Sequence, residues 1–334
     1  FTATVDQPKL SAIEVFYPGS TPSPDPATAW PTSWSTGRPA PAACFATAAT
    51  TLGGIIYRFG GFDSRFRVLR SYTSYNPATN TWTNLGTMPA GMAESHQGIT
   101  TDGRYIYLAG GFAGGINTSV EPTQTVSNRV YRFDPLANTF VQIAALPQGR
   151  GAGALDFLNG KLHYISGNPA DRVTNVGDHF VYDLAAKTWS VAAPLPNPKD
   201  HMSTAVLGGK IYIVGGEHGH DELHQQQADC HVYDPATNTW SQIGSLPGAK
   251  SHIEAGTFVS DGRIIMAGGQ VDNFQPTAQV VAYDPVLNRW TTLPSLPAPR
   301  QGAIIQRVGN RIVIALGGIQ TYQPQSNVWI GTLP

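Results

Sequence analysis

The chain has 334 residues and a formal net charge of −1 at pH 7, and it holds 36 glycines and 26 prolines but only 13% charged residues. This composition is typical of a rigid, turn-rich β-protein, and the lack of Lys or Arg runs excludes nucleic acid and anionic membrane surfaces from the expected partners. No apolar stretch is long enough to cross a bilayer, so the sequence predicts no transmembrane helix.

The chain begins with Phe1, which we interpret as a processed N-terminus, although a shortened chain would look the same. Together with a Lys-poor surface rich in Gly, Thr, Asn and Pro, this start predicts an exported protein, either secreted or periplasmic. Two strands are predicted next, over residues 11–17 and 28–35.

From about residue 38 to 334, one pattern of about fifty residues occurs six times. Two strands joined by a Gly-containing hairpin, a and b, end in a doublet of small residues. A loop then leads to strands c and d, which a turn such as DPATN connects. The doublets are Gly60-Gly61, Gly110-Gly111, Ser166-Gly167, Gly215-Gly216, Gly268-Gly269 and Gly317-Gly318. The turns between strands c and d lie between Asn76 and Trp82, Asp134 and Phe140, Asp183 and Trp189, Asp234 and Trp240, Asp284 and Trp290, and Gln323 and Trp329.

This pattern resembles the kelch repeat, whose marks are a double glycine after strand b and a spaced Tyr and Trp in strands c and d, here Tyr233 and Trp240. The resemblance covers nearly the whole chain. It implies an all-β fold, a six-bladed kelch β-propeller with four antiparallel strands per blade. Neighbouring sheets in a closed ring bury apolar faces that one sheet alone would expose, so we predict a single domain over residues 1–334.

The two ends of the chain do not divide cleanly into repeats. Residues 11–17 and 28–35 look like strands c and d without a and b, so N-terminal strands within about 11–35 are predicted to complete the last blade and close the ring. The C-terminal segment 321–330 competes for the same places, and an incomplete seventh blade is the alternative. Cys44 and Cys230 fall in repeats one and four, which a ring places far apart, so no disulfide is expected.

The starts of strands a and the loops between strands b and c are expected on one face of the disc, around the mouth of the channel. His96 and His201 each stand fourteen residues before their doublet and His252 stands sixteen before its own, which predicts that the three share one face. Arg150 and Arg300 occupy nearby positions on the rim.

The loop between strands b and c of the fourth repeat is unusual, because it carries Glu217, His218, His220, Asp221 and His224. One hypothesis is a solvated loop whose histidines bond to turns and backbone. A second is acid–base chemistry by Glu217 and a histidine without metal. A third is a site for one divalent metal ion, Zn, Fe, Mn or Cu, with ligands drawn from His201, Glu217, His220, His224 and His252.

Three groups of kelch enzymes are similar to this chain in part. The copper-radical constellation of galactose oxidase-like proteins is missing, since the chain has no Tyr-His dipeptide. The E-x₃-D-x₃-H iron motif of plant glucosinolate specifier proteins is matched by Glu217 and Asp221, but the third place is Gln225. Bacterial N-acetylneuraminate epimerases, exported six-bladed kelch proteins, carry a Glu after the blade-four glycine, as Glu217 does, and an Arg six residues on, where this chain has Leu223.

We therefore expect an exported, monomeric propeller with a His/Glu site at the channel mouth for a small molecule or glycan. The leading hypothesis is an isomerase, epimerase or lyase acting on a sugar or sugar acid, with Glu217 as the acid/base. In this hypothesis His201, His220 or His252 assists, and Arg150 or Arg300 holds a substrate carboxylate. The alternative is a non-catalytic kelch interaction or ligand-binding module, since a fold does not decide a function.

Overall fold

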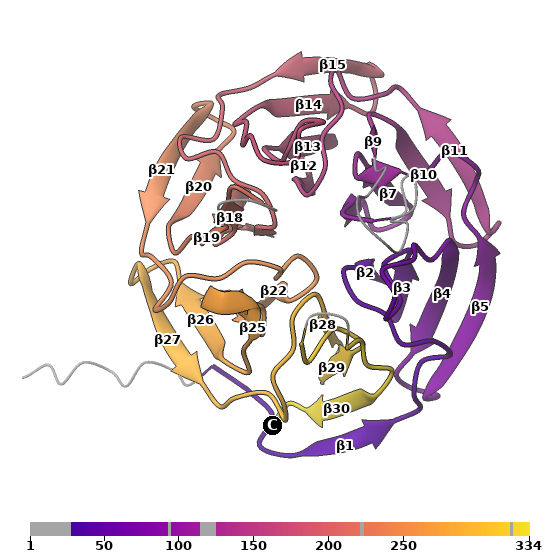
Figure 1. Ribbon diagram of the computed structural model, residues 1–334. Coiled ribbons are helices and arrows are strands. Elements are labelled where there is room, and N and C mark those ends of the chain that lie inside the picture. The colour runs from indigo at the N-terminus through magenta and orange to yellow at the C-terminus, as the bar shows by residue number, and fades with distance from the viewer. Residues whose placement is uncertain (1–27, 93–94, 114–124, 221–223, 321–322) are drawn as a thin grey trace, which may run out of the picture.

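The computed structural model describes residues 28–92, 95–113, 125–220, 224–320 and 323–334. Over these ranges the secondary structure is β-strand except for one 3₁₀ turn, Asp272–Phe274. Six four-stranded antiparallel sheets stand around a central axis, as Figure 1 shows. This arrangement confirms the predicted six-bladed β-propeller. No helix within the described ranges has the length and apolar character needed to span a bilayer.

Five blades are each made of four strands that follow one another along the chain. From the channel outward, they are β2 (Ala48–Leu52), β3 (Ile55–Phe59), β4 (Ser71–Asn76) and β5 (Thr81–Thr87) in blade one; β6 (Gly98–Thr101), β7 (Ile106–Ala109), β10 (Val130–Asp134) and β11 (Thr139–Ile143) in blade two; β12 (Ala154–Leu158), β13 (Lys161–Ile165), β14 (His179–Asp183) and β15 (Thr188–Val191) in blade three; β16 (Ser203–Leu207), β17 (Lys210–Val214), β20 (Cys230–Asp234) and β21 (Thr239–Ile243) in blade four; and β22 (Thr257–Ser260), β23 (Arg263–Ala267), β26 (Val280–Asp284) and β27 (Arg289–Leu293) in blade five.

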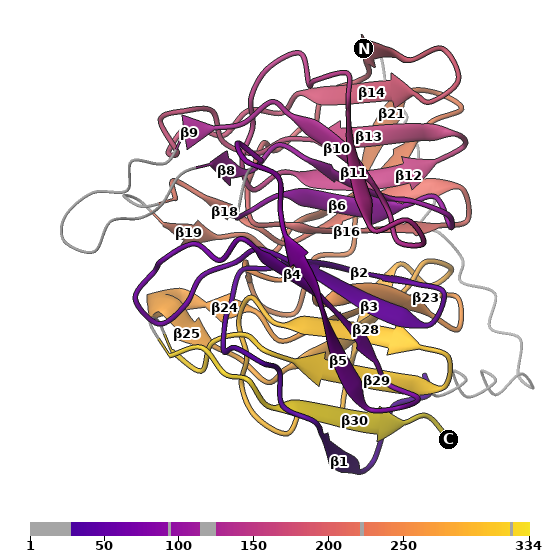
Figure 2. The same cartoon turned by 90° about the vertical axis from the view of Figure 1, so that its right-hand side faces the viewer.

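Short two-stranded hairpins occupy the loops between strands b and c in three blades. They all project from the same face of the disc, on the left of Figure 2, so this face is the channel mouth that the sequence predicts. The hairpins pair β8 (Phe112–Ala113) with β9 (Thr125–Val126), β18 (Glu217–His218) with β19 (Gln225–Gln226), and β24 (Gln270–Val271) with β25 (Gln275–Pro276).

The sixth blade closes the ring by combining both ends of the chain. Its order is β28 (Ile304–Val308), β29 (Arg311–Ala315), β30 (Val328–Thr332) and, outermost, β1 (Trp34–Gly37). The N-terminus therefore supplies strand d, as predicted, but the C-terminus supplies strand c. Trp329 lies on that strand c, so the predicted c–d turn between Gln323 and Trp329 is wrong. Residues 11–17 lie outside the described residues, and the described part of the chain has no strand left for a seventh blade.

The repeated Tyr, Asn and Trp side chains connect each blade to the one before it. The Tyr233 hydroxyl donates to Asn238 Oδ1 over 2.8 Å, and the same oxygen accepts the Ala193 N–H of the preceding blade over 2.9 Å. The Trp240 indole N–H donates to the Ala193 carbonyl over 2.8 Å. Because buried Tyr and Trp need hydrogen-bond partners, this triad recurs wherever two blades pack.

The doublet after strand b is a second connection between blades. Gly215 has φ 57°, and a Cβ there would lie 2.6 Å from the Lys250 carbonyl oxygen of the next blade. Gly216 donates its N–H to that same carbonyl over 2.7 Å. In blade six the equivalent residues are Leu316, with φ 61°, and Gly317, so the predicted doublet at 317–318 is one residue too late.

The interface between blades three and four buries a histidine pair. His163 Nδ1 lies 2.9 Å from His179 Nε2, and the His179 ring packs 4.6 Å from that of Tyr233. Burial lowers the pKa of His163 to about 4 and, helped by His163, that of His179 to about 3. Both rings are therefore neutral packing residues. Cys44 and Cys230 are free and buried, which confirms that they form no disulfide.

Replacing Gly215 with Ala should destabilise the protein more than replacing Gly208 with Ala. Both glycines have left-handed backbone, φ 57° and 59°, which costs an alanine about 1–2 kcal/mol, but a Cβ at Gly208 meets nothing within 4 Å. The clash at Gly215 should add roughly 1–3 kcal/mol, because the neighbouring blade must move. Thermal unfolding followed by circular dichroism measures both variants, and equal losses in Tm would contradict this account.

The His163–His179 pair should make the fold sensitive to acid. Between pH 6.5 and about 4 the unfolded chain binds protons that the folded pair refuses, so the free energy of unfolding falls by about 1.4 kcal/mol per pH unit for each ring that stays neutral. Val130 and Val280 occupy the position of His179 in blades two and five. His179→Val should therefore lose less Tm than the unsubstituted protein between pH 7 and pH 5; an identical loss would refute the assignment.

Candidate functional site

Six residues with left-handed backbone, one from each blade, form the innermost ring of the mouth. They are joined by backbone hydrogen bonds: the N–H of His201 donates to the Ala152 carbonyl over 3.0 Å, and that of His252 to the His201 carbonyl over 3.1 Å. This ring confirms that the three histidines predicted to share a face are equivalent. Its members are Ala46, His96, Ala152, His201, His252 and Gly302, with φ between 48° and 53°.

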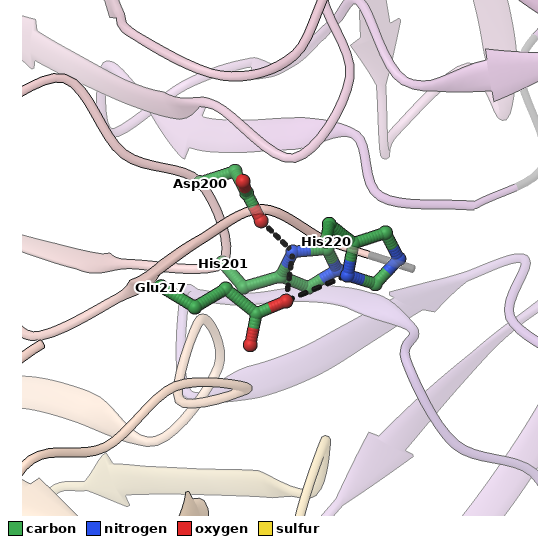
Figure 3. Close-up of side chains that lie close together, drawn as sticks. All are labelled: Asp200, His201, Glu217 and His220. Atoms are coloured by element: carbon green, nitrogen blue, oxygen red, sulfur yellow. Dashed lines mark hydrogen bonds and ion pairs between the residues drawn. The ribbon is translucent and has the colours of Figure 1, made fainter. Parts of the chain in front are cut away.

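A β-bridge next to this ring brings two carboxylates to the axis. Asp200, which precedes His201, exchanges backbone hydrogen bonds of 3.1 and 2.9 Å with Glu217, the residue after the doublet. Both side chains are completely buried. Figure 3 shows them converging on the imidazoles of His201 and His220. The sequence analysis did not select Asp200, and the pairing of position 200 with 217 across the doublet is the signal that could have found it.

The Glu217 carboxylate is the centre of the cluster, and each of its oxygens faces different imidazoles. Oε1 lies 2.6 Å from His220 Nδ1 and 3.4 Å from His201 Nδ1. Oε2 lies 2.6 Å from His224 Nε2 and 3.5 Å from His252 Nδ1. The structure therefore brings together all five residues that the sequence proposed as metal ligands.

Stacking and hydrogen bonds fix these groups. The His201 ring lies between those of His220 and His252, 4.3 Å from each and 23° from parallel. Asp200 contacts His201 Nδ1 through Oδ1 and accepts hydrogen bonds at Oδ2 from Asn168, over 3.0 Å, and Asn175. The arrangement is preorganised, because each ring is held by its neighbours.

The electrostatics separate the protonation states of the cluster. Burial raises the pKa of Glu217, but His252 and His201 outweigh burial and hold it well below its ordinary value. Burial lowers the pKa of His252, but the Glu217 carboxylate raises it to about 9. Burial, helped by the Glu217 charge, raises the pKa of Asp200 to about 7. At neutral pH Glu217 is therefore an anion paired with a protonated His252.

The donor atoms form two sets in which all atoms lie within 4.8 Å of one another. Imidazole nitrogens with carboxylate oxygens suit Zn, Fe, Mn or Cu as divalent ions. His218 belongs to neither set, and Asp221 lies outside the described residues. The first set is Asp200, His201, Glu217 and His220, and the second is Glu217, His224 and His252.

Arg150 and Arg300 do not join the cluster. The Arg150 guanidinium pairs with Asp178, and the Arg300 guanidinium donates to Asn327 Oδ1 over 3.0 Å and lies 4.5 Å over the Trp329 ring. Both therefore link the start of strand a to strand c of the same blade. Their spacing put them on the rim, but the spacing did not reveal that their side chains turn away from the axis.

Arg172, in the b–c loop of blade three, is the arginine that the structure brings to the cluster. Its Nη2 lies 3.5 Å from His220 Nε2, and its guanidinium lies 4.7 Å over the Phe112 ring. Nothing in the spacing of the sequence distinguishes it from other loop arginines.

Aromatic side chains from blades one and two form the other side of the mouth. The rings of Phe62 and Phe112 lie 5.6 and 5.5 Å from that of His96, and Phe66 packs 5.6 Å from Phe62. The mouth is therefore apolar on one side and polar on the other, as in small-molecule sites that combine apolar walls with a few polar groups.

Comparisons with known proteins agree on the repeat. The family model described as the KLHDC2/KLHL20/DRC7 Kelch-repeats domain matches residues 159–318, and the Kelch motif model matches residues 43–89 and 95–147. The kelch repeat-containing protein At3g27220 of Arabidopsis thaliana is 25% identical over 248 residues, which are 69% of this chain and 56% of that protein. The kelch-like protein terF of Aspergillus terreus is 26% identical over 257 residues, 73% of this chain and 56% of that protein.

This chain thus spans about half the length of these curated relatives. Among solved structures, that of YjhT superposes with a TM-score of 0.71 at 15% identity, covering 87% of this chain and 95% of the other. At this level of identity the likeness concerns the fold alone.

Glu217→Gln should lower the pKa of His252 in metal-free protein. Without the carboxylate charge, burial and the neighbouring rings remain, so the pKa should fall from about 9 to below the ordinary 6.5. An NMR titration of the imidazole Cε1–H signals measures it. The pKa of His163 should stay near 4 as an internal control. A His252 pKa that stayed near 9 would show that Glu217 is not its partner.

Proposed function

The chain belongs to the kelch-repeat β-propellers, and from that premise we propose that it is an enzyme whose catalytic site is the Glu217 cluster, assisted by divalent metal. The observation that carries the proposal is Glu217 itself, a fully buried carboxylate with both oxygens 2.6 Å from separate imidazoles. Such a charge is costly to bury unless it is paired, and clusters of perturbed ionisable groups gather at functional sites.

The donors fit a metal ion better than a hydrogen-bond network. His201 Nδ1 faces carboxylate oxygens of both Asp200 and Glu217, yet one ring nitrogen carries at most one proton. A cation held by His201, Asp200, Glu217 and His220 would satisfy both carboxylates. The ion would supply Lewis-acid polarisation of a substrate oxygen.

The protein side chains supply proton transfer and orientation. Glu217 and His252 form an ionised pair in which the carboxylate can accept a proton and the imidazolium can donate one. Arg172, beside His220, would hold a substrate carboxylate in the role first assigned to Arg150 or Arg300. The Phe66 and Phe62 wall would pack against the less polar face of the substrate.

We infer a sugar acid or related hydroxy acid as the substrate and epimerisation, isomerisation or elimination next to its carboxylate as the reaction. Each of these reactions begins with removal of a proton from carbon, which an ionised Glu–His pair can perform. A non-catalytic interaction module is the alternative class of function. The burial of Glu217 favours the enzyme, because a protein partner would contact exposed side chains instead.

Glu217→Gln should abolish carbon-bound proton exchange with solvent. Incubating the protein with a panel of sugar acids in D₂O, with Mn²⁺ or Zn²⁺ present, and following the C–H signals by NMR would detect this exchange. The variant should be slower by at least ~100-fold, as expected for loss of a general base.

His218→Ala is the matched control, since His218 lies in the same loop but in neither donor set, and it should keep its activity. Exchange that survived in Glu217→Gln would contradict the role of Glu217. No exchange with any acid in the unsubstituted protein would favour the interaction module.

A further inference from the structure

We propose that the cluster holds two divalent ions bridged by the Glu217 carboxylate; this inference rests on the proposed function and specifies its metal site. The two donor sets share only Glu217, and they use its two oxygens separately. A carboxylate that offers one oxygen to each of two ions is the arrangement of two-metal sites, where the ions lie about 3.5–4 Å apart.

The first ion would lie between Glu217 Oε1, His220 Nδ1, His201 Nδ1 and Asp200 Oδ1. Oε1 is 2.6 Å from His220 Nδ1 and 3.4 Å from His201 Nδ1, and Asp200 faces the same nitrogen of His201. The four donors come from the strand-a start and the b–c loop of blade four. Asp200 is anchored at its other oxygen by Asn168 and Asn175, an outer shell that would orient a metal ligand.

A second and independent conflict lies at His224. Its Nε2 is 2.6 Å from Glu217 Oε2, so it must carry a hydrogen to bond that carboxylate. The same nitrogen is also 3.0 Å from Gln226 Nε2 and 3.1 Å from Gln270 Nε2, which are donors and require it to carry none. One imidazole nitrogen cannot meet both demands.

An ion at this second position removes the conflict. His224 Nε2 and Glu217 Oε2 would both be ligands, with His252 Nδ1, 3.5 Å from Oε2, as the third. Gln226 Oε1 is buried without a hydrogen-bond partner, and turning that amide by 180° would present an oxygen to the ion. The Ser251 hydroxyl, 2.5 Å from Oε2, lies at the same end.

The charges also favour two ions. Asp200 and Glu217 contribute at most two negative charges, and the remaining ligands are neutral when they bind metal. Two divalent ions would leave a net positive centre beside Arg172, which suits a substrate with an anionic carboxylate or phosphate. The class of ligand is therefore a small oxyanion that spans two cations.

Metal stoichiometry tests the proposal directly. Chelator-treated protein titrated with Zn²⁺ in a calorimeter, with bound metal counted by mass spectrometry, should bind two ions per chain. His220→Ala should lose the first ion and His224→Ala the second, each keeping one, while Glu217→Gln should weaken both by at least ~10-fold. His218→Ala should keep two. Circular dichroism and Tm would confirm that each variant is folded.

Mn²⁺ provides a readout that a merely structural effect would not change. Two bridged Mn²⁺ ions should give an exchange-coupled electron paramagnetic resonance spectrum, which His220→Ala and His224→Ala should each convert to that of an isolated ion. One ion per chain, lost in both histidine variants, would overturn the two-ion site and leave the proposed enzyme intact. No bound metal would overturn it as well, and the D₂O exchange of metal-free protein would then decide the acid–base role of Glu217 separately.

Discussion

One backbone hydrogen bond between neighbouring blades determines where everything else in the mouth lies. The second residue of each doublet donates its N–H to a carbonyl at the start of strand a in the next blade. Because this bond requires left-handed backbone at both positions of the doublet, it fixes the direction of the chain as it leaves strand b. The bonds run from Gly111 to Arg150, Gly167 to Lys199, Gly216 to Lys250, Gly269 to Arg300 and Gly317 to Cys44, over 2.7 to 3.1 Å.

The chemistry of the mouth is an addition to this frame and not a requirement of it. The residue after the doublet is Glu217 in blade four but Phe62, Phe112 and Gly318 in others. At the innermost ring, His201 corresponds to Ala46, Ala152 and Gly302. Small and apolar residues therefore satisfy the same backbone geometry, and a buried cluster of charged groups lowers stability unless its members neutralise one another. Its concentration in one sector is the physical reason to regard it as functional.

The comparisons reflect the same division. A structure with 15% sequence identity superposes with a TM-score of 0.71, which shows how few residues the propeller frame needs. The frame is preserved by doublets and by blade-linking Tyr, Asn and Trp side chains, while the residues at the mouth vary freely. Function must therefore be argued from Glu217 and its neighbours and not from the fold.

The sequence by itself determined the six blades, the mouth and the equivalence of His201 with His252, because strand and turn spacing is encoded within each repeat. It did not determine that Leu316 would occupy a glycine position or that Trp329 would lie on strand c, since both follow from how the two chain ends share one blade. Only the tertiary structure decided that Asp200 and Arg172 belong to the cluster and that Arg150 and Arg300 do not. Side-chain direction around a channel depends on contacts between blades, such as the 2.5 Å bond from Ser251 to Glu217, and such contacts exist only once the ring has closed.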